Sequence, residues 1–102
     1  MYIVYLIQSK STKEIYIGYT NNLKRRLFEH NENKSYSTKN GGPWELIYCE
    51  AYRSKEDATT REKRLKYYGN GLAQLKRRIS KSLLWNLKGA GKKGRKVLLA
   101  LR

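Results

Sequence analysis

The sequence contains few of the residues that build disulfide scaffolds, zinc sites or membrane spans. Its single cysteine, Cys49, excludes an internal disulfide and offers no cluster of zinc ligands. Because Cys49 lies in the apolar stretch 46–49, we interpret it as a buried strand thiol. The longest apolar run at the N-terminus, residues 2–7, is too short to span a membrane and lacks the basic start of a signal peptide. We therefore expect a cytoplasmic protein.

Several familiar enzyme motifs are also absent. The chain has no Gly-x-x-x-x-Gly-Lys loop for nucleotide phosphates, no Cys/His metal cluster and no paired aspartates. What remains is a chain of 102 residues that is 39% apolar and contains nine tyrosines. That length allows one modest core, and that composition is typical of a folded domain.

Acidic residues are scarce. Eight acids against 23 Lys and Arg give a net charge of +15, which indicates a polyanionic partner such as nucleic acid. Residues 61–102 hold 14 of these basic residues and one acid, Glu62. An ordinary solvated surface is the alternative, but we favour contacts to the phosphate backbone of duplex or branched DNA, with RNA left open. The candidate nucleic-acid-binding residues are Arg25, Lys66, Lys76, Arg77, Arg78, Lys81, Lys92 and Lys93.

The N-terminal segment predicts a β-hairpin. Residues 2–7 and 14–19 are rich in β-branched and aromatic side chains, and the segment that connects them is polar. If paired residue numbers sum to 21, Tyr5 lies directly opposite Tyr16 on one face of the hairpin.

A helix is expected next, capped by Asn21 or Asn22 and ending near Asn33. Leu23 and Leu27 form its apolar stripe. At 100° per residue, Arg26 and His30 share or flank that stripe, so both are expected to face the core. A loop over residues 34–43 then leads to a third strand from Trp44 to about Tyr52.

Ser54 and Asp57 form a capping-box pattern that opens a second helix, on which Glu62 falls between the inward positions Ala58 and Leu65. Gly69-Asn70-Gly71 is expected to break this helix. A third helix with apolar residues at helical spacing should follow, up to Leu84 or Trp85.

These elements predict an α+β fold, a small three-stranded antiparallel sheet flanked by three helices. Residues 1–85 are interpreted as the domain. Residues 86–102 are interpreted as a basic C-terminal arm, because residues 88–96 are rich in glycine, lysine and arginine. We expect a monomer, with a homodimer left open.

One group of residues could perform chemistry together: tyrosines on paired strands, an Arg with a His one turn later, and an inward Glu. Phosphodiester hydrolysis needs an activated water, positive charge on the phosphate oxygens and help for the departing 3′ oxygen. Glu62 could hold Mg²⁺, and Arg26 offers a planar fork of donors suited to phosphate. A tyrosine hydroxyl can accept a proton from water if its pKa is lowered or its own proton is relayed onward.

With these residues in this order, the sequence resembles the GIY-YIG nuclease family. Ile3-Val4-Tyr5 matches the first motif and Tyr16-Ile17-Gly18 the second; Arg26 matches the Arg motif and Glu62 the metal-binding Glu. The resemblance covers about residues 2–68. His30 and Gly42-Pro43-Trp44-Glu45 are more similar to the branched-DNA-cutting and stand-alone bacterial branches than to the excision-repair branch.

The resemblance implies a DNA endonuclease, with DNA repair and recombination as the expected processes. The enzyme would work with one Mg²⁺ ion, for which Mn²⁺ can substitute. A motif tyrosine, Tyr5 or Tyr16, would be the general base. Arg26 would stabilise the transition state and Glu62 would carry the metal ion. His30 would be hydrogen-bonded to the tyrosine.

The chain departs from the family pattern in three places. The first triplet lacks its glycine, and Tyr19 replaces the Lys that often follows Tyr-Ile-Gly. The Asn expected about a dozen residues after the Glu is absent; Gln74 stands near that position and Asn70 is the nearest Asn. Gly18, Tyr19, Asn70 and Gln74 are therefore candidates for a supporting role.

Each candidate also has a structural interpretation. Tyr5 and Tyr16 could simply be strand aromatics that pack across the hairpin, and His30 could be a structural histidine. Arg26 could be a solvated charge, and Glu62 could pair with Arg61 or Lys66 on the surface. The alternative function is a non-catalytic, basic nucleic-acid-binding module that retains the fold.

Overall fold

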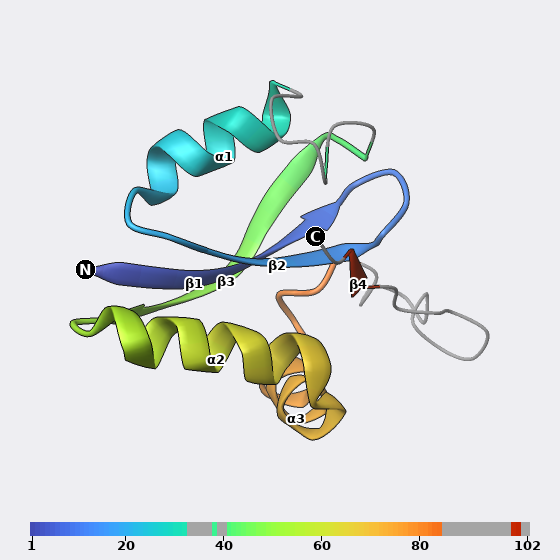
Figure 1. The fold of residues 1–102 in the computed structure, drawn as a ribbon. Coiled ribbons are helices and arrows are strands. Elements are labelled where there is room, and N and C mark those ends of the chain that lie inside the picture. The colour runs from blue at the N-terminus through green and yellow to red at the C-terminus, as the bar shows by residue number, and fades with distance from the viewer. Residues whose placement is uncertain (33–37, 39–40, 85–98, 101–102) are drawn as a thin grey trace.

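The computed structural model describes residues 1–32, 38, 41–84 and 99–100. It has an α+β architecture in which helices cover both faces of a twisted sheet (Figure 1). The strands lie in the order β3-β1-β2-β4. The elements along the chain are β1 (Tyr2–Ser9), β2 (Ile15–Thr20), α1 (Leu23–Asn31), β3 (Trp44–Tyr52), α2 (Lys55–Tyr67), α3 (Gly69–Arg78) and β4 (Leu99–Ala100).

The three predicted strands are confirmed, and both β2 and β3 pair antiparallel with β1. The predicted register of the hairpin is wrong, because Tyr5 lies opposite Gly18 and Tyr16 lies opposite Ile7. The difference is a shift of two residues, and side chains alternate with a period of two. Tyr5 and Tyr16 therefore still share one face, as diagonal rather than direct neighbours.

The hairpin connection explains this register. Ser9 N–H donates to the Glu14 carbonyl at 2.9 Å, and Lys13 N–H donates to the Ser9 carbonyl at 3.0 Å. Lys13 adopts a left-handed backbone conformation with φ 70°. The turn thus closes on Ser9, two residues later than the hydrophobic pattern suggests.

Two clusters of apolar side chains fix the layers of the fold. In Figure 1, α1 lies over one face of the sheet, whereas α2 and α3 lie on the other. Leu23 and Leu27 of α1 pack against the smaller cluster, which is centred on Tyr5, Ile7, Tyr16 and Trp44. The larger cluster joins the opposite sheet face to α2 and α3 and consists of Val4, Leu6, Ile15, Ile17, Ala58, Leu65, Leu72, Leu75 and Leu83.

The helix starts follow from their capping residues. The Asn22 side chain accepts a hydrogen bond from Arg25 N–H at 3.1 Å, and the Ser54 hydroxyl accepts one from Asp57 N–H at 3.3 Å. Both interactions satisfy amide groups that the helix itself leaves unpaired. Of the two caps predicted for α1, Asn21 and Asn22, the structure uses Asn22, and the predicted start of α2 after Ser54 is confirmed.

The predicted break at Gly69-Asn70-Gly71 is wrong. The break is at Tyr68, whose backbone is extended, and α3 begins at Gly69. The helix also ends at Arg78 rather than near Leu84. The chain turns there because Leu83 enters the core and Leu84 N–H donates to Gln8 Oε1 at 2.8 Å, which draws this segment back to the sheet.

Two further findings concern the sheet edges. Cys49 lies on β3, which forms one edge of the sheet, and it is exposed, so the predicted burial is wrong. At the other edge, the two-residue strand β4 pairs in parallel with Ile15 and Tyr16 and was not predicted.

The rest of the proposed C-terminal arm lies outside the described residues. Among the described residues, no helix is long and apolar enough to cross a membrane.

Candidate active site

The site begins where Tyr5 crosses Gly18. These residues are paired between β1 and β2, and a Cβ atom added to Gly18 would collide with the Tyr5 hydroxyl group and ring. The phenol of Tyr5 therefore lies across the backbone of β2 at a position where no other residue type fits without displacement. This contact gives a physical reason for the glycine of Tyr16-Ile17-Gly18.

Three aromatic rings converge on the α1 face of the sheet. The ring centroids of Tyr5 and Tyr16 are 6.4 Å apart, and those of Tyr16 and His30 are 5.0 Å apart. His30 is the buried residue of α1, and it reaches the sheet from the last turn of that helix. The structure thus brings together three residues that the sequence predicted as a group.

His30 connects Tyr5 to a residue that the sequence analysis missed. His30 Nε2 lies 2.8 Å from Tyr5 Oη, and Nδ1 lies 2.6 Å from Thr38 Oγ1. Trp44 Nε1 donates to the Thr38 carbonyl at 3.0 Å and fixes Thr38 in place. No motif marks Thr38, and it lies in none of the described helices and strands.

Burial changes the pKa values of Tyr5 and His30. Desolvation, helped by the positive charge of Arg26, lowers the pKa of His30 to about 4, so the imidazole is neutral at pH 7. Desolvation and the neighbouring Tyr16 raise the pKa of Tyr5. Arg26 acts in the opposite direction on Tyr5, through its charge and a hydrogen bond. Tyr5 is consequently a neutral phenol held against a neutral imidazole.

Arg26 is held at the rim of the site. Its Nη1 atom lies 2.9 Å from Glu29 Oε1, one turn further along α1, and about a quarter of the side chain is exposed. The guanidinium therefore lies beside Tyr5 and keeps part of its surface accessible. It is not the fully solvated charge of the alternative interpretation.

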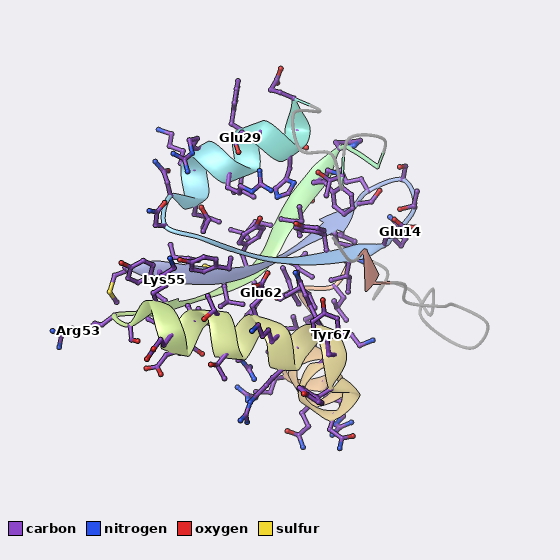
Figure 2. The ribbon with its side chains drawn as sticks, viewed as in Figure 1. Glu14, Glu29, Arg53, Lys55, Glu62 and Tyr67 are labelled. Carbon is purple, nitrogen blue, oxygen red and sulfur yellow. The ribbon has the colours of Figure 1, made fainter. Side chains whose placement is uncertain are left out.

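Glu62 projects from α2, which covers the sheet face opposite α1 (Figure 1), and its charge still acts on Tyr5. Figure 2 shows its side chain directed from α2 toward the sheet. Its Oε2 atom lies 2.8 Å from Lys66 Nζ, and both side chains are almost fully buried. Lys66 Nζ also lies 6.0 Å from the centroid of the Tyr16 ring. The pairing with Lys66 considered from the sequence thus exists, but beneath the surface.

The remaining candidates lie apart from these residues. Tyr19 points into the α2 side of the sheet and stacks on Tyr2 with ring centroids 6.3 Å apart. Asn70 and Gln74 are exposed on α3. Arg25, Arg77, Arg78 and Lys81 are exposed and Lys76 is half-buried, whereas Lys92 and Lys93 lie outside the described residues.

The GIY-YIG catalytic domain family matches residues 1–76 of the chain. The chain belongs to this family. Membership implies a nuclease fold and places the chain among hydrolases that act on nucleic acids. The four residues chosen from the sequence as motif residues, Tyr5, Tyr16, Arg26 and Glu62, all lie within this range.

Curated relatives of this GIY-YIG chain are UPF0213 proteins. That of Oceanobacillus iheyensis is 36% identical over 64 residues, which is 62% of this chain and 73% of the relative. That of Clostridium perfringens is 36% identical over 63 residues, 61% of this chain and 67% of the relative. The solution NMR structure of the UPF0213 protein from Bacillus halodurans is 29% identical, with a TM-score of 0.47 over 82% of this chain and 98% of that chain.

The missing glycine of the first GIY-YIG triplet has a structural explanation. Ile3 occupies that position, pairs with Thr20, and packs its side chain against the cluster around Tyr5. The strand here is regular, and no turn or close backbone contact requires a glycine. The substitution therefore adds apolar contact without disturbing Tyr5.

Members of the GIY-YIG family are generally metal-dependent, and Glu62 is compatible with such an ion. No group of three or more potential ligands (His, Cys, Asp or Glu) occurs within the described part of the chain. Mg²⁺ needs only one or two carboxylates when water and substrate phosphate complete its octahedron. The Glu62 carboxylate already holds a cationic ammonium group at 2.8 Å, which shows that this position favours positive charge.

Proposed function

We infer that this chain is a Mg²⁺-dependent endonuclease that hydrolyses phosphodiester bonds in DNA. The observation that carries this proposal is the hydrogen bond between Tyr5 and the neutral His30, beside Arg26 and Glu62. If Tyr5 had only a packing role, any hydrogen-bond partner would satisfy its buried hydroxyl group. Here the partner is a proton acceptor, and the other neighbours carry the charges that phosphate chemistry requires.

The proton path starts at Tyr5. In the tautomer that fits the contacts, His30 Nδ1–H donates to Thr38 Oγ1, and His30 Nε2 accepts from Tyr5 Oη–H. As a water oxygen attacks the phosphorus, the water proton passes to Tyr5 Oη while the Tyr5 proton passes to His30 Nε2. Tyr5 thus acts as general base without first becoming a free tyrosinate, although its pKa is raised.

Arg26 is the group that suits the non-bridging phosphate oxygens. Its guanidinium presents several N–H donors in one plane and stays charged at any pH at which the protein is folded. It hydrogen-bonds Glu29 in the free protein. A phosphate would take the place of the Glu29 carboxylate, whose side chain is itself partly exposed.

Glu62 would exchange its partner in the same way when a metal ion binds. The buried ammonium neutralises Glu62 in the free protein, and a divalent ion would take its place at the carboxylate. When bound, the ion would supply positive charge at the scissile phosphate and at the departing 3′ oxygen. The 3′ oxygen takes its proton from solvent. Lys66, released from Glu62, would remain beside Tyr16 and contribute positive charge near the phosphate.

The net charge of +15, most of which lies after residue 60, supports a nucleic-acid substrate, and DNA is proposed because the chain belongs to the GIY-YIG family. The exposed cations of α3, Arg77 and Arg78, are candidates for contacts to the phosphate backbone. Such contacts position the nucleic acid without selecting a sequence.

The test is a cleavage panel of supercoiled plasmid, linear duplex and branched DNA, with Mg²⁺ and with EDTA. Glu62→Gln should abolish Mg²⁺-dependent cleavage while leaving binding nearly unchanged. Glu56→Gln, an exposed position on the same helix, is the matched control and should cleave normally. Binding without cleavage under Mg²⁺ or Mn²⁺ would instead support the non-catalytic module.

A further inference from the structure

A second feature of the surface lies between α2 and α3, on the sides of α2 that do not carry Glu62. It is a pocket of about 600 Å³. No carboxylate is among its lining residues, which are Thr60, Arg61, Lys63, Arg64, Tyr68 and Gly71. The pocket therefore combines three cations with one aromatic ring.

Arg61 is fixed in an orientation that suits a ligand. Glu50 of β3 accepts from Arg61 Nε at 3.0 Å and from Nη2 at 2.9 Å. These bonds occupy one edge of the guanidinium and direct Nη1 toward Gly71, where an added Cβ would lie 4.0 Å from it. The pocket thus contains a preorganised N–H donor, and preorganisation reduces the entropy lost on binding.

The other two cations keep the pocket positive. Lys63 and Arg64 are exposed, and within the described residues neither forms an ion pair. The charge selects an anion, and a phosphate group is the anion that matches a guanidinium.

Tyr68 adds a different kind of contact. Two thirds of its side chain (66%) is exposed, although tyrosine loses free energy when its ring faces water. An exposed ring next to cations is the arrangement that binds unpaired nucleic-acid bases by stacking. In a duplex the base faces are covered by neighbouring bases, so the ring favours a single strand.

We propose that this pocket binds one nucleotide of a single-stranded segment, with the phosphate on Arg61, Lys63 and Arg64 and the base stacked on Tyr68. This inference rests on the proposed nuclease function and narrows its substrate to DNA that has an unpaired strand beside the cleaved duplex. The geometry is compatible, because a helix with its side chains is about 10–12 Å across and Glu62 lies on the buried face of the same helix. A strand of a few nucleotides spans that distance.

Fluorescence anisotropy in EDTA tests the pocket without any cleavage. The probes are a labelled oligothymidylate and the same strand paired with oligoadenylate. Tyr68→Ser should weaken binding of the single strand about tenfold and leave the duplex nearly unchanged, whereas Tyr68→Phe, which keeps the ring, should bind within about twofold of wild type. Tyr67→Ser is the matched control, since Tyr67 is 61% exposed but does not line the pocket.

The cations give an independent readout. The double variant Lys63→Gln and Arg64→Gln should flatten the dependence of log affinity on log salt by about 0.7 per neutralised contact on the single strand. Lys55→Gln, at the far end of the same helix (Figure 2), should change this salt dependence less. Unchanged single-strand affinity of Tyr68→Ser would overturn the proposal, as would an equal loss for duplex and single strand.

Failure of this proposal can be distinguished from failure of the proposed function. If the wild-type chain cleaves DNA but Tyr68→Ser binds single strands normally, the pocket assignment is wrong and the nuclease assignment stands. If Tyr68→Ser loses single-strand binding but no substrate is cleaved with Mg²⁺, the pocket stands as a binding site and the nuclease assignment is wrong.

Discussion

Tyr5 Oη and His30 Nε2 lie 2.8 Å apart although 25 residues separate them in the chain. Both side chains are fully buried. The hydrogen bond joins the central strand of the sheet to the last turn of α1, and it makes the protonation state of His30 a property of the whole fold.

The pH dependence of stability should report on this bond. The pKa of His30 is lowered to about 4 in the folded protein, against about 6.5 for an unperturbed histidine. Between these values the unfolded chain binds a proton that the folded chain does not, so the free energy of unfolding should fall as pH falls from 6.5 to 4. The loss is roughly 3 kcal/mol at the lower limit.

Urea denaturation at a series of pH values measures this loss. His30→Gln removes the one histidine of the sequence and should flatten the curve in that window. An identical slope in wild type and His30→Gln would show that the folded pKa of His30 is not lowered.

Removal of the Tyr5 hydroxyl group should show whether Tyr5 takes part in catalysis or only packs in the core. Tyr5→Phe keeps the ring but ends the proton path, so we expect kcat to fall about 10²- to 10⁴-fold with little change in DNA affinity. Single-turnover cleavage measures the effect. Tyr19→Phe, on the opposite face of the sheet, is the control and should be nearly as active as wild type. If Tyr5→Phe stays active and Tyr16→Phe does not, Tyr16 is the base.

Gly18 should tolerate no side chain. Gly18→Ala places a methyl group against Tyr5, and we expect a loss of about 1–3 kcal/mol in the free energy of unfolding together with reduced cleavage. Gly69→Ala is the matched control, because nothing lies within 4 Å of an added Cβ there and alanine favours a helix. Chemical denaturation compares the two variants. Equal stability of both would mean that Tyr5 does not cross Gly18 as described.

Lys66 should compete with a metal ion for Glu62. Lys66→Met leaves the buried carboxylate without its counter-ion, so the metal-free protein should lose about 3–5 kcal/mol of stability. Mn²⁺ should bind more tightly and raise the melting temperature by more than in wild type. Calorimetry with Mn²⁺ alone provides this readout without DNA. Lys63→Met is the exposed control, and weaker Mn²⁺ binding by Lys66→Met would contradict the exchange of cations.

Features that depend on a few neighbouring residues were predictable from the sequence. The caps at Asn22 and Ser54 are satisfied within three residues, and the inward face of α2 that carries Glu62 follows from helical periodicity alone. Membership of the GIY-YIG family also lies in the sequence, because its motifs are short and occur in a fixed order.

Features that depend on contacts between distant parts of the chain were decided only by the tertiary structure. The hairpin register was set by a turn that closes on Ser9, and the hydrophobic pattern could not distinguish it from a shift of two residues, because both place the same side chains on the same face. The hydrogen bond between His30 and Thr38 joins side chains that no local sequence pattern pairs, and Cys49 is exposed on β3 although the apolar stretch around it predicted burial.

The tyrosines, Arg26, His30 and Glu62 could thus be chosen from the sequence, as could a hydrogen bond from His30 to a tyrosine and a pairing of Glu62 with Arg61 or Lys66. Which tyrosine His30 contacts, that Lys66 pairs with Glu62 beneath the surface, and that Glu50 aligns Arg61 are consequences of burial and packing. Residue type and spacing determine which groups are available. Only the folded chain brings each of them within hydrogen-bonding distance of a particular partner.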